Sequence, residues 1–354
     1  MPFLPKAGPS TPPQHPDDAP IPQNPEAPAW QRDMQTAFRT LESLLRHLGL
    51  DPALAPDRLL TDPAFPLLAT RSFADRMVRG DWNDPLLRQV LPVGAEDVSA
   101  AGFHDDAVGD LASQVVPGLL HKYDSRALML ISPNCAIHCR YCFRREFPYG
   151  DLPRGPAAWD EAWAYLESAE GVDEIIFSGG DPLFLDDRRL ARILEGALGL
   201  PSIRTVRFHT RLPVVLPSRV DPGLLALLGD LAAAKSLVMV IHANHPAEIA
   251  ADCPPALEAL RKTGALLLNQ AVLLKGINDD ADVLAELSRR LVRLGVLPYY
   301  LNQLDRVTGA AHFETTQDRG LELMEILRRK LPGYAVPRYV REVAGEAYKR
   351  PLAP

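Results

Sequence analysis

Three of the chain's four cysteines lie close together in the spacing C-x3-C-x2-C, as Cys135, Cys139 and Cys142. Thiolates are soft metal ligands, so this spacing predicts metal chemistry. A tetrahedral zinc site would need a fourth ligand, for which His138 and Cys253 are the candidates. An iron–sulfur cluster held by three thiolates would leave one iron able to chelate a small molecule through an amine and a carboxylate. A third interpretation is that the three cysteines are buried thiols that bind no metal.

A glycine motif follows the cysteines, in the segment SGGDP. Alone, two glycines after a strand usually mark a tight turn. Beside a cysteine loop they favour a ligand site at the strand end. Asp181 is interpreted as a turn or helix-capping residue rather than as a metal ligand.

Lys349 stands near the end of the sequence. Such a lysine is usually a solvated charge. Here residues 336–343 predict a short strand, and Ala344–Gly345 predict a turn that would fold Lys349 back over the site. A lysine amine can form an imine with pyridoxal 5′-phosphate.

The elements that must position these residues begin at residue 126, where short β-rich apolar runs alternate with helical patterns. This alternation of strand and helix patterns predicts βαβ units, a parallel sheet and an α/β fold. Six such units favour an incomplete (β/α) barrel, and a doubly wound sheet is the alternative. The predicted strands are 126–132, 174–180, 205–211, 237–244, 266–274 and 297–304.

Polar residues occur at the carboxyl ends of these runs, including Asp181, His209, His242, Asn269 and Asp305. In α/β barrels this end of the strands carries the chemistry. We therefore expect these residues to lie around one site. His242 and its neighbours in the segment HANHP are interpreted as residues that hydrogen-bond within the site or line its ligand, rather than as metal ligands.

The bulk composition limits the class of protein. With 354 residues and 47% hydrophobic content, the chain can bury a large core. A net charge of -7 argues against nucleic-acid binding, and no apolar run is long enough for a membrane span. The first residues lack the apolar region and the cleavage site of a secretory signal, so we expect a cytoplasmic protein. In that reducing compartment, clustered cysteines are more often metal-binding than disulfide-bonded. The predicted organisation is a disordered Pro-rich tail (1–28), a helical region (29–122), the partial barrel (123–314) and a C-terminal helix with the lysine segment (315–354).

From about residue 71 to residue 352 the sequence resembles the lysine 2,3-aminomutase family of radical S-adenosylmethionine enzymes. The matching segments include RSFADRM, VVPGLLHKY, CRYCFRREFPY, DEIIFSGGDPL and LPYYLNQLD. The similarity is strongest to the short branch that makes (R)-β-lysine for modification of elongation factor P. This resemblance implies a partial (β/α)6 barrel of the radical S-adenosylmethionine type.

The resemblance also implies three cofactors, which are a [4Fe-4S] cluster, S-adenosylmethionine and pyridoxal phosphate. Cys135, Cys139 and Cys142 would hold the cluster, and Lys349 would bind the pyridoxal. The other cofactor-binding residues implied are Arg126 at the phosphate and, for S-adenosylmethionine, Ser178, Gly179, Gly180, Asp181, His209 and Asn269. The substrate-binding residues implied are Arg144 at the carboxylate, with Asp305 and Glu342 at the distal ammonium.

The activity implied is an isomerase that converts L-α-lysine to β-lysine by radical chemistry. Its partners would be a reductant such as flavodoxin or ferredoxin, with a functional link to elongation factor P and its lysine ligase. Three alternatives are a 2,3-aminomutase acting on arginine or glutamate, an enzyme making free β-lysine, and a metal-stabilised scaffold without catalysis.

Overall fold

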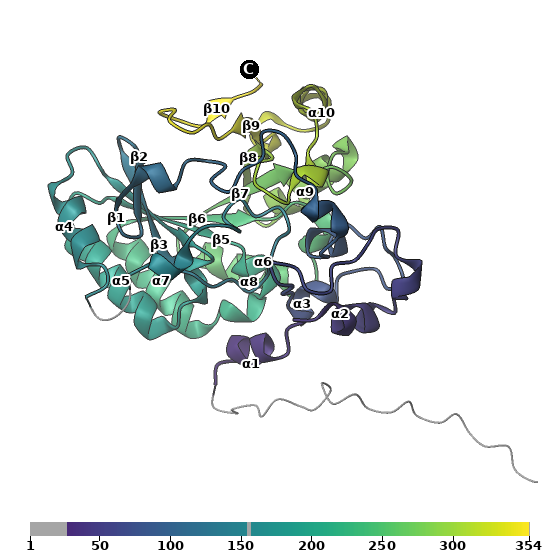
Figure 1. Ribbon diagram of the computed structural model, residues 1–354. Helices are drawn as coiled ribbons and strands as arrows, with labels where there is room; N and C mark the ends of the chain where they lie inside the picture. Colours follow the sequence, from purple (N-terminus) through teal and green to yellow (C-terminus); the bar gives the residue numbers. More distant parts are fainter. Residues whose placement is uncertain (1–26, 154–156, 354) are drawn as a thin grey trace, which may run out of the picture.

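The computed structural model describes residues 27–153 and 157–353. These residues form a ten-stranded sheet whose strands follow one another in chain order (Figure 1). The strands are β1 (Gln114–Val116), β2 (Leu119–Tyr123), β3 (Arg126–Ser132), β4 (Glu174–Gly179), β5 (Thr205–Thr210), β6 (Ser236–His242), β7 (Leu266–Leu273), β8 (Leu297–Gln303), β9 (Arg338–Arg341) and β10 (Arg350–Pro351).

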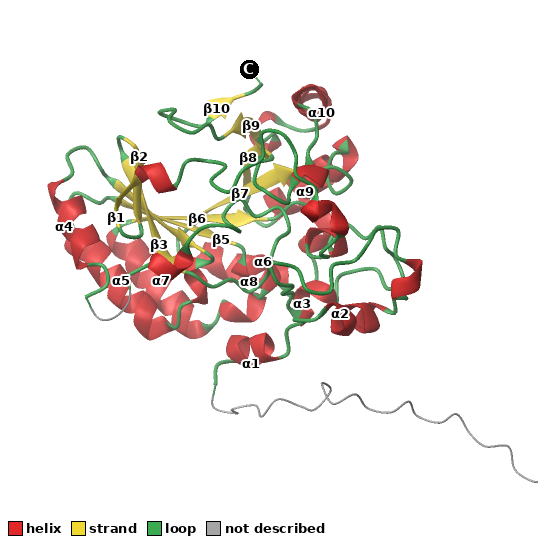
Figure 2. Cartoon of the chain, viewed as in Figure 1, coloured by secondary structure: helices red, strands yellow, loops and turns green. Residues whose placement is uncertain are grey.

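The α-helices gather along one side of the strands and beyond β7 and β8 (Figure 2). They are α1 (Ala29–Gln35), α2 (Leu41–Leu48), α3 (Arg71–Ala74), α4 (Asp160–Ser168), α5 (Asp187–Gly199), α6 (Leu212–Val215), α7 (Pro222–Ala234), α8 (Cys253–Lys262), α9 (Ala281–Arg293) and α10 (Gln317–Lys330).

Strands β3 to β9 are all parallel, whereas β1, β2 and β10 add antiparallel edges. The six predicted strands are confirmed as β3 to β8. Because their order never reverses, the sheet lacks the switch point of a doubly wound fold, and that alternative is wrong. The fold is α/β, with the predicted partial barrel of six βα units.

Local sequence explains where the helices after the strands begin. Asp186, Asp221, Asp280 and Thr316 each accept a hydrogen bond from a backbone N–H in the first turn of α5, α7, α9 and α10. Such caps satisfy donors that the helix itself leaves without partners. Apolar side chains of α5 and α7 pack in the main core, those of α10 pack in a second apolar cluster with β7, β8 and β9, and α9 contributes to both.

The N-terminal region differs from the prediction in two places. The apolar residues between Trp30 and Leu50 have helical spacing, yet they divide between α1 and α2, because Phe38 pairs with Ala69 and Thr40 caps α2. The region predicted as helical, 29–122, also contains β1 and most of β2. Of the predicted tail, residues 1–26 lie outside the described residues. Within the described ranges, no helix is both long and apolar enough to span a membrane.

The C-terminal segment turns back as predicted. After β9 comes a turn at Ala344–Gly345, where Gly345 has a φ of +80° that favours glycine. The chain then returns as β10, which pairs antiparallel with β9. This hairpin places Glu342 and Lys349 over the carboxyl ends of the parallel strands.

Candidate active site

A cavity of about 430 Å³ lies at the carboxyl ends of most of the parallel strands and extends along β3 to its first residue, Arg126. Its wall combines residues from the strand ends with residues from the N-terminal region and the C-terminal hairpin. Thirteen of the fourteen predicted site residues line it: Arg126, Cys135, Cys139, Cys142, Arg144, Ser178, Gly179, Gly180, Asp181, His209, Asp305, Glu342 and Lys349. The structure thus brings the cysteines and Lys349 to one cavity from distant parts of the sequence.

The glycine motif packs directly against the start of the cysteine loop. The N–H of Gly180 donates to the carbonyl of Ser132, and the N–H of Asp181 donates to that of Asn134, both at 2.7 Å. Gly179 has a φ of +132°, and a side chain there would collide with the carbonyl oxygen of Ser132. Glycine is therefore required for this close approach of two backbones.

The N-terminal region holds the other side of the cysteine loop, a role that the sequence analysis did not predict. The N–H of His138 donates to the carbonyl of Leu68, and the N–H of Arg140 to that of Gln89, both at 2.9 Å. Buried Glu96 forms ion pairs with Arg140 and Arg145 from the same loop. These contacts fix the loop between two parts of the fold.

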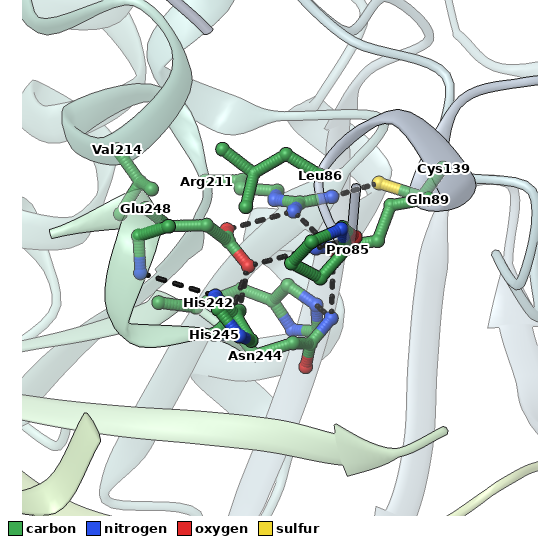
Figure 3. A network of polar contacts seen from close by, with 12 residues as sticks. Pro85, Leu86, Gln89, Cys139, Arg211, Val214, His242, Asn244, His245 and Glu248 are labelled. Carbon is green, nitrogen blue, oxygen red and sulfur yellow. Dashed lines mark hydrogen bonds and ion pairs between the residues drawn. The ribbon is translucent and has the colours of Figure 1, made fainter. Parts of the chain in front are cut away.

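A polar network joins this region to the cysteine loop and to the loop that follows β6 (Figure 3). The Arg211 guanidinium donates to the sulfur of Cys139 at 2.6 Å, to Glu248 at 2.8 Å and to Gln89 at 2.7 Å. Glu248 is fully buried, so its charge requires the arginine as a partner. Sequence reasoning missed Gln89 and Glu248.

The segment HANHP contributes hydrogen bonds to the same network, as predicted. The Nε2 of His242 lies 3.0 Å from the Tyr141 hydroxyl, and the Asn244 amide donates to that hydroxyl at 2.6 Å. Burial lowers the pKa of His242 to about 3, so its ring is neutral.

The cysteines themselves lie in a setting unfavourable to free thiolates. Burial, together with charge on Cys139, raises the pKa of Cys142 to about 11. Burial and its two fellow cysteines also raise the pKa of Cys135. Ionised cysteines at these positions would need a nearby positive charge, and bound iron ions would supply it. In the described ranges, no three His, Cys, Asp or Glu side chains converge as ligands of a single metal ion.

Lys349 also lines the cavity, in contact with a carboxylate. Its amine is 2.9 Å from Glu342 and donates to the side-chain oxygen of Asn302 at 3.3 Å. Glu342 also accepts a 2.6 Å hydrogen bond from the Tyr123 hydroxyl. Burial raises the pKa of Glu342, but Lys349 and its other partners hold it below the usual value.

Arg126 lines the same wall and stacks on Tyr123, with its guanidinium carbon 4.1 Å from the ring centre. Among the residues described, no carboxylate lies within ion-pair distance of this guanidinium. An arginine without a carboxylate partner, exposed to a cavity, is suited to bind a phosphate.

Comparison with known proteins decides the family. No protein-family profile matches the chain. The chain is 42% identical to an L-lysine 2,3-aminomutase of Escherichia coli, covering 91% of this chain and 94% of the relative. It is 38% identical to an L-lysine 2,3-aminomutase of Haemophilus influenzae, covering 93% and 98%.

The chain belongs to the L-lysine 2,3-aminomutase family. It is therefore an enzyme of the isomerase class, an aminomutase. A more distant family member from Clostridium subterminale is 32% identical, with 92% of this chain and 78% of that protein covered. A radical SAM methyltransferase from Sphaerobacter thermophilus is similar over 63% of this chain and 68% of its own, with 21% identity and a TM-score of 0.41.

In this aminomutase, Arg144 is held by a residue that the sequence analysis missed. Its Nε donates to Asp110 at 2.7 Å, and its Nη1 donates to the hydroxyl of Ser178 at 3.0 Å. Asp110 also pairs with Lys122 at 2.7 Å. Arg144 faces the cavity between these partners.

Asp305 lines the aminomutase cavity without a partner for its carboxylate among the described residues. Burial raises its pKa to about 6, although Lys349 nearby acts in the opposite direction. A half-buried carboxylate in this condition would be stabilised by a cation.

Asn269 is the predicted site residue that the aminomutase fold does not bring to the cavity. Its side chain bonds the backbone N–H and carbonyl of Ala243, at 2.9 and 3.1 Å. Side chains alternate between the faces of a strand, so Gln270 lines the cavity instead.

Asp181 and His209 complete the placement of the predicted residues. Asp181 is a capping residue, as predicted, because its carboxylate accepts from the N–H of Leu183 and also from that of Arg211. His209 faces the cavity, and burial, with help from nearby Arg207, holds its pKa well below the usual value.

Proposed function

We propose that this aminomutase converts L-α-lysine to β-lysine by radical chemistry that uses S-adenosylmethionine and pyridoxal phosphate. The observation that carries the proposal is the meeting of three cysteines and Lys349 around one cavity. The product is proposed to be (R)-β-lysine for modification of elongation factor P. The similarity to the Escherichia coli and Haemophilus influenzae relatives over nearly their full length supports the short branch.

Cys135, Cys139 and Cys142 would hold the [4Fe-4S] cluster, leaving one iron for S-adenosylmethionine. The strand end at Ser178–Asp181 would bind the methionyl part, because its backbone lies against the cysteine loop. Arg211 would supply positive charge next to Cys139. When bound, the cluster would supply the electron that starts the radical reaction, and pyridoxal phosphate would carry the migrating amino group.

Lys349 would hold the pyridoxal covalently, and Arg126 would bind its phosphate. Glu342 lies against the amine of Lys349. It would hold this amine in place whenever the substrate displaces Lys349 from the pyridoxal. Tyr123 contacts both Glu342 and Arg126, so it would link the two cofactor-binding residues.

The substrate would bind between opposite charges. Arg144 would take the α-carboxylate, and Asp305 with Glu342 would take the distal ammonium. Two acids at the distal end favour a cationic amino acid and disfavour glutamate, whose side chain would require a cation there. Holding both ends would fix the reacting carbon atoms close to the cofactors.

The test is anaerobic turnover of isotopically labelled L-lysine by the reconstituted enzyme, with the R and S products resolved. We expect (R)-β-lysine and, separately, stoichiometric iron and sulfide. Conversion of arginine or glutamate in preference to lysine would overturn the substrate assignment. Zinc in place of iron and sulfide would overturn the radical chemistry.

Replacing Asp305 by asparagine should weaken lysine binding and remove its dependence on pH. In the unmodified enzyme, the carboxylate ionises as the pH rises through about 6, so lysine affinity should rise through that pH and then level off. Below it, affinity should fall about tenfold per pH unit. Equilibrium dialysis of labelled lysine between pH 5 and 8 measures this.

The matched control is Asp62→Asn, which removes an exposed carboxylate that is not part of the cavity lining. It should keep the pH step of the unmodified enzyme. The same step in Asp305→Asn would show that another group binds the ammonium.

A further inference from the structure

Asp110 is a buried acid placed between two cations of the cavity wall. Its Oδ1 is 2.7 Å from the amine of Lys122, and its Oδ2 accepts from Nε of Arg144 at 2.7 Å. Only 3% of Asp110 is exposed, and 8% of Arg144. Lys122 continues the contacts to Glu342, at 3.9 Å. One carboxylate therefore neutralises two charges that would otherwise repel each other in a poorly solvated place.

The contacts of Arg144 leave a defined edge of its guanidinium for a ligand. Nε is occupied by Asp110, Nη1 donates to Ser178, and the plane packs against Phe143, with 4.7 Å from the guanidinium carbon to the ring centre. Across the described ranges, Nη2 contacts no protein acceptor. The end of the fork formed by Nη1 and Nη2 is thus the part that can meet a carboxylate with two parallel hydrogen bonds.

The charge state supports the same geometry. Burial by itself pushes the pKa of Asp110 up, yet Arg144 and Lys122 hold it below the usual value. Asp110 is therefore ionised at neutral pH, and its carboxylate accepts the hydrogen bond from Nε of Arg144 without a proton transfer. Removing its charge would leave Arg144 free to turn about its long side chain. Lys122 would keep only its hydrogen bond to the carbonyl of Val108 and its longer contact with Glu342.

We propose that Asp110 is a positioning residue that orients Arg144, so that the enzyme selects amino acids with a free α-carboxylate. This inference rests on the proposed role of Arg144 in carboxylate binding. Asp110 itself would not touch the substrate. It would act through the guanidinium, and its second contact with Lys122 would keep the carboxylate from rotating away.

The test compares binding of L-lysine with binding of L-lysinamide, which keeps both amines and lacks the carboxylate charge. Equilibrium dialysis of the reconstituted enzyme at one fixed pH gives the ratio of the two dissociation constants. We expect the unmodified enzyme to prefer lysine by about tenfold or more. In Asp110→Asn we expect this ratio to fall close to one, through weaker binding of lysine.

The ratio distinguishes positioning from a general structural role, because misfolding would weaken the binding of lysine and of lysinamide alike. The double variant Asp110→Asn with Lys122→Met removes both charges together. It should be more stable than Asp110→Asn alone, while its ratio of dissociation constants should stay close to one. Asp57→Asn, at an exposed site, should keep the ratio of the unmodified enzyme. An unchanged ratio in Asp110→Asn would overturn this inference alone. A ratio near one in the unmodified enzyme would overturn the role of Arg144 as well.

Discussion

Gly179→Ala is expected to lose most of its iron, because the new side chain would collide with the carbonyl of Ser132. The positive φ of +132° at this position adds backbone strain for any residue other than glycine. The chain can relieve the collision only by moving the segment that leads into Cys135. We expect a loss of about 3 kcal/mol in the free energy of unfolding.

Two measurements check this prediction. Iron and sulfide per chain after anaerobic reconstitution report the cluster, and thermal unfolding of the metal-free protein reports the fold. Gly199→Ala is the matched control, because a side chain at this last residue of α5 would have no atom within 4 Å. Full iron content in Gly179→Ala, with unchanged thermal stability, would mean that the two backbones separate at little cost.

The barrel strands were predictable because each carries its signal locally. A run of apolar β-formers between turn residues fixes a strand without reference to the rest of the chain, and all six strands were found in this way. The face of a polar residue within a strand depends on alternation, which puts Asn269 and Gln270 on opposite faces of β7. Alternation places Gln270 beside Val272 on the cavity face.

The residues that support the site were not predictable in this way. Asp110 and Arg144 are in contact although they are 34 residues apart in the sequence, and Gln89 and Glu248 are 159 residues apart. Neither pair leaves a local pattern, since an acid or amide in a loop is usually solvated. Their role arises only when the N-terminal region packs on the cysteine loop. The cysteines, Lys349 and Asp305 were found by motif and resemblance, and the residues that orient them required the fold.

Lys349→Ala is expected to abolish turnover, with a decrease of about a thousandfold or more, because the cofactor would lose its covalent attachment. Glu342 would keep its hydrogen bond from Tyr123 and its approach to Lys122, so the wall of the cavity should remain folded. The measurement is the pyridoxal retained per chain after borohydride reduction and gel filtration under denaturing conditions. We expect about one per chain in the unmodified enzyme and almost none in the variant.

Lys275→Ala is the control, since Lys275 is an exposed lysine outside the cavity lining and should retain the full amount. Iron content should be the same in all three proteins, because Lys349 contacts Glu342, Asn302 and Tyr300 rather than the cysteines. Equal covalent pyridoxal in Lys349→Ala and in the unmodified enzyme would assign the attachment to another amine. Lys122 would then be the first to test, because its amine also lines the cavity and lies near Glu342.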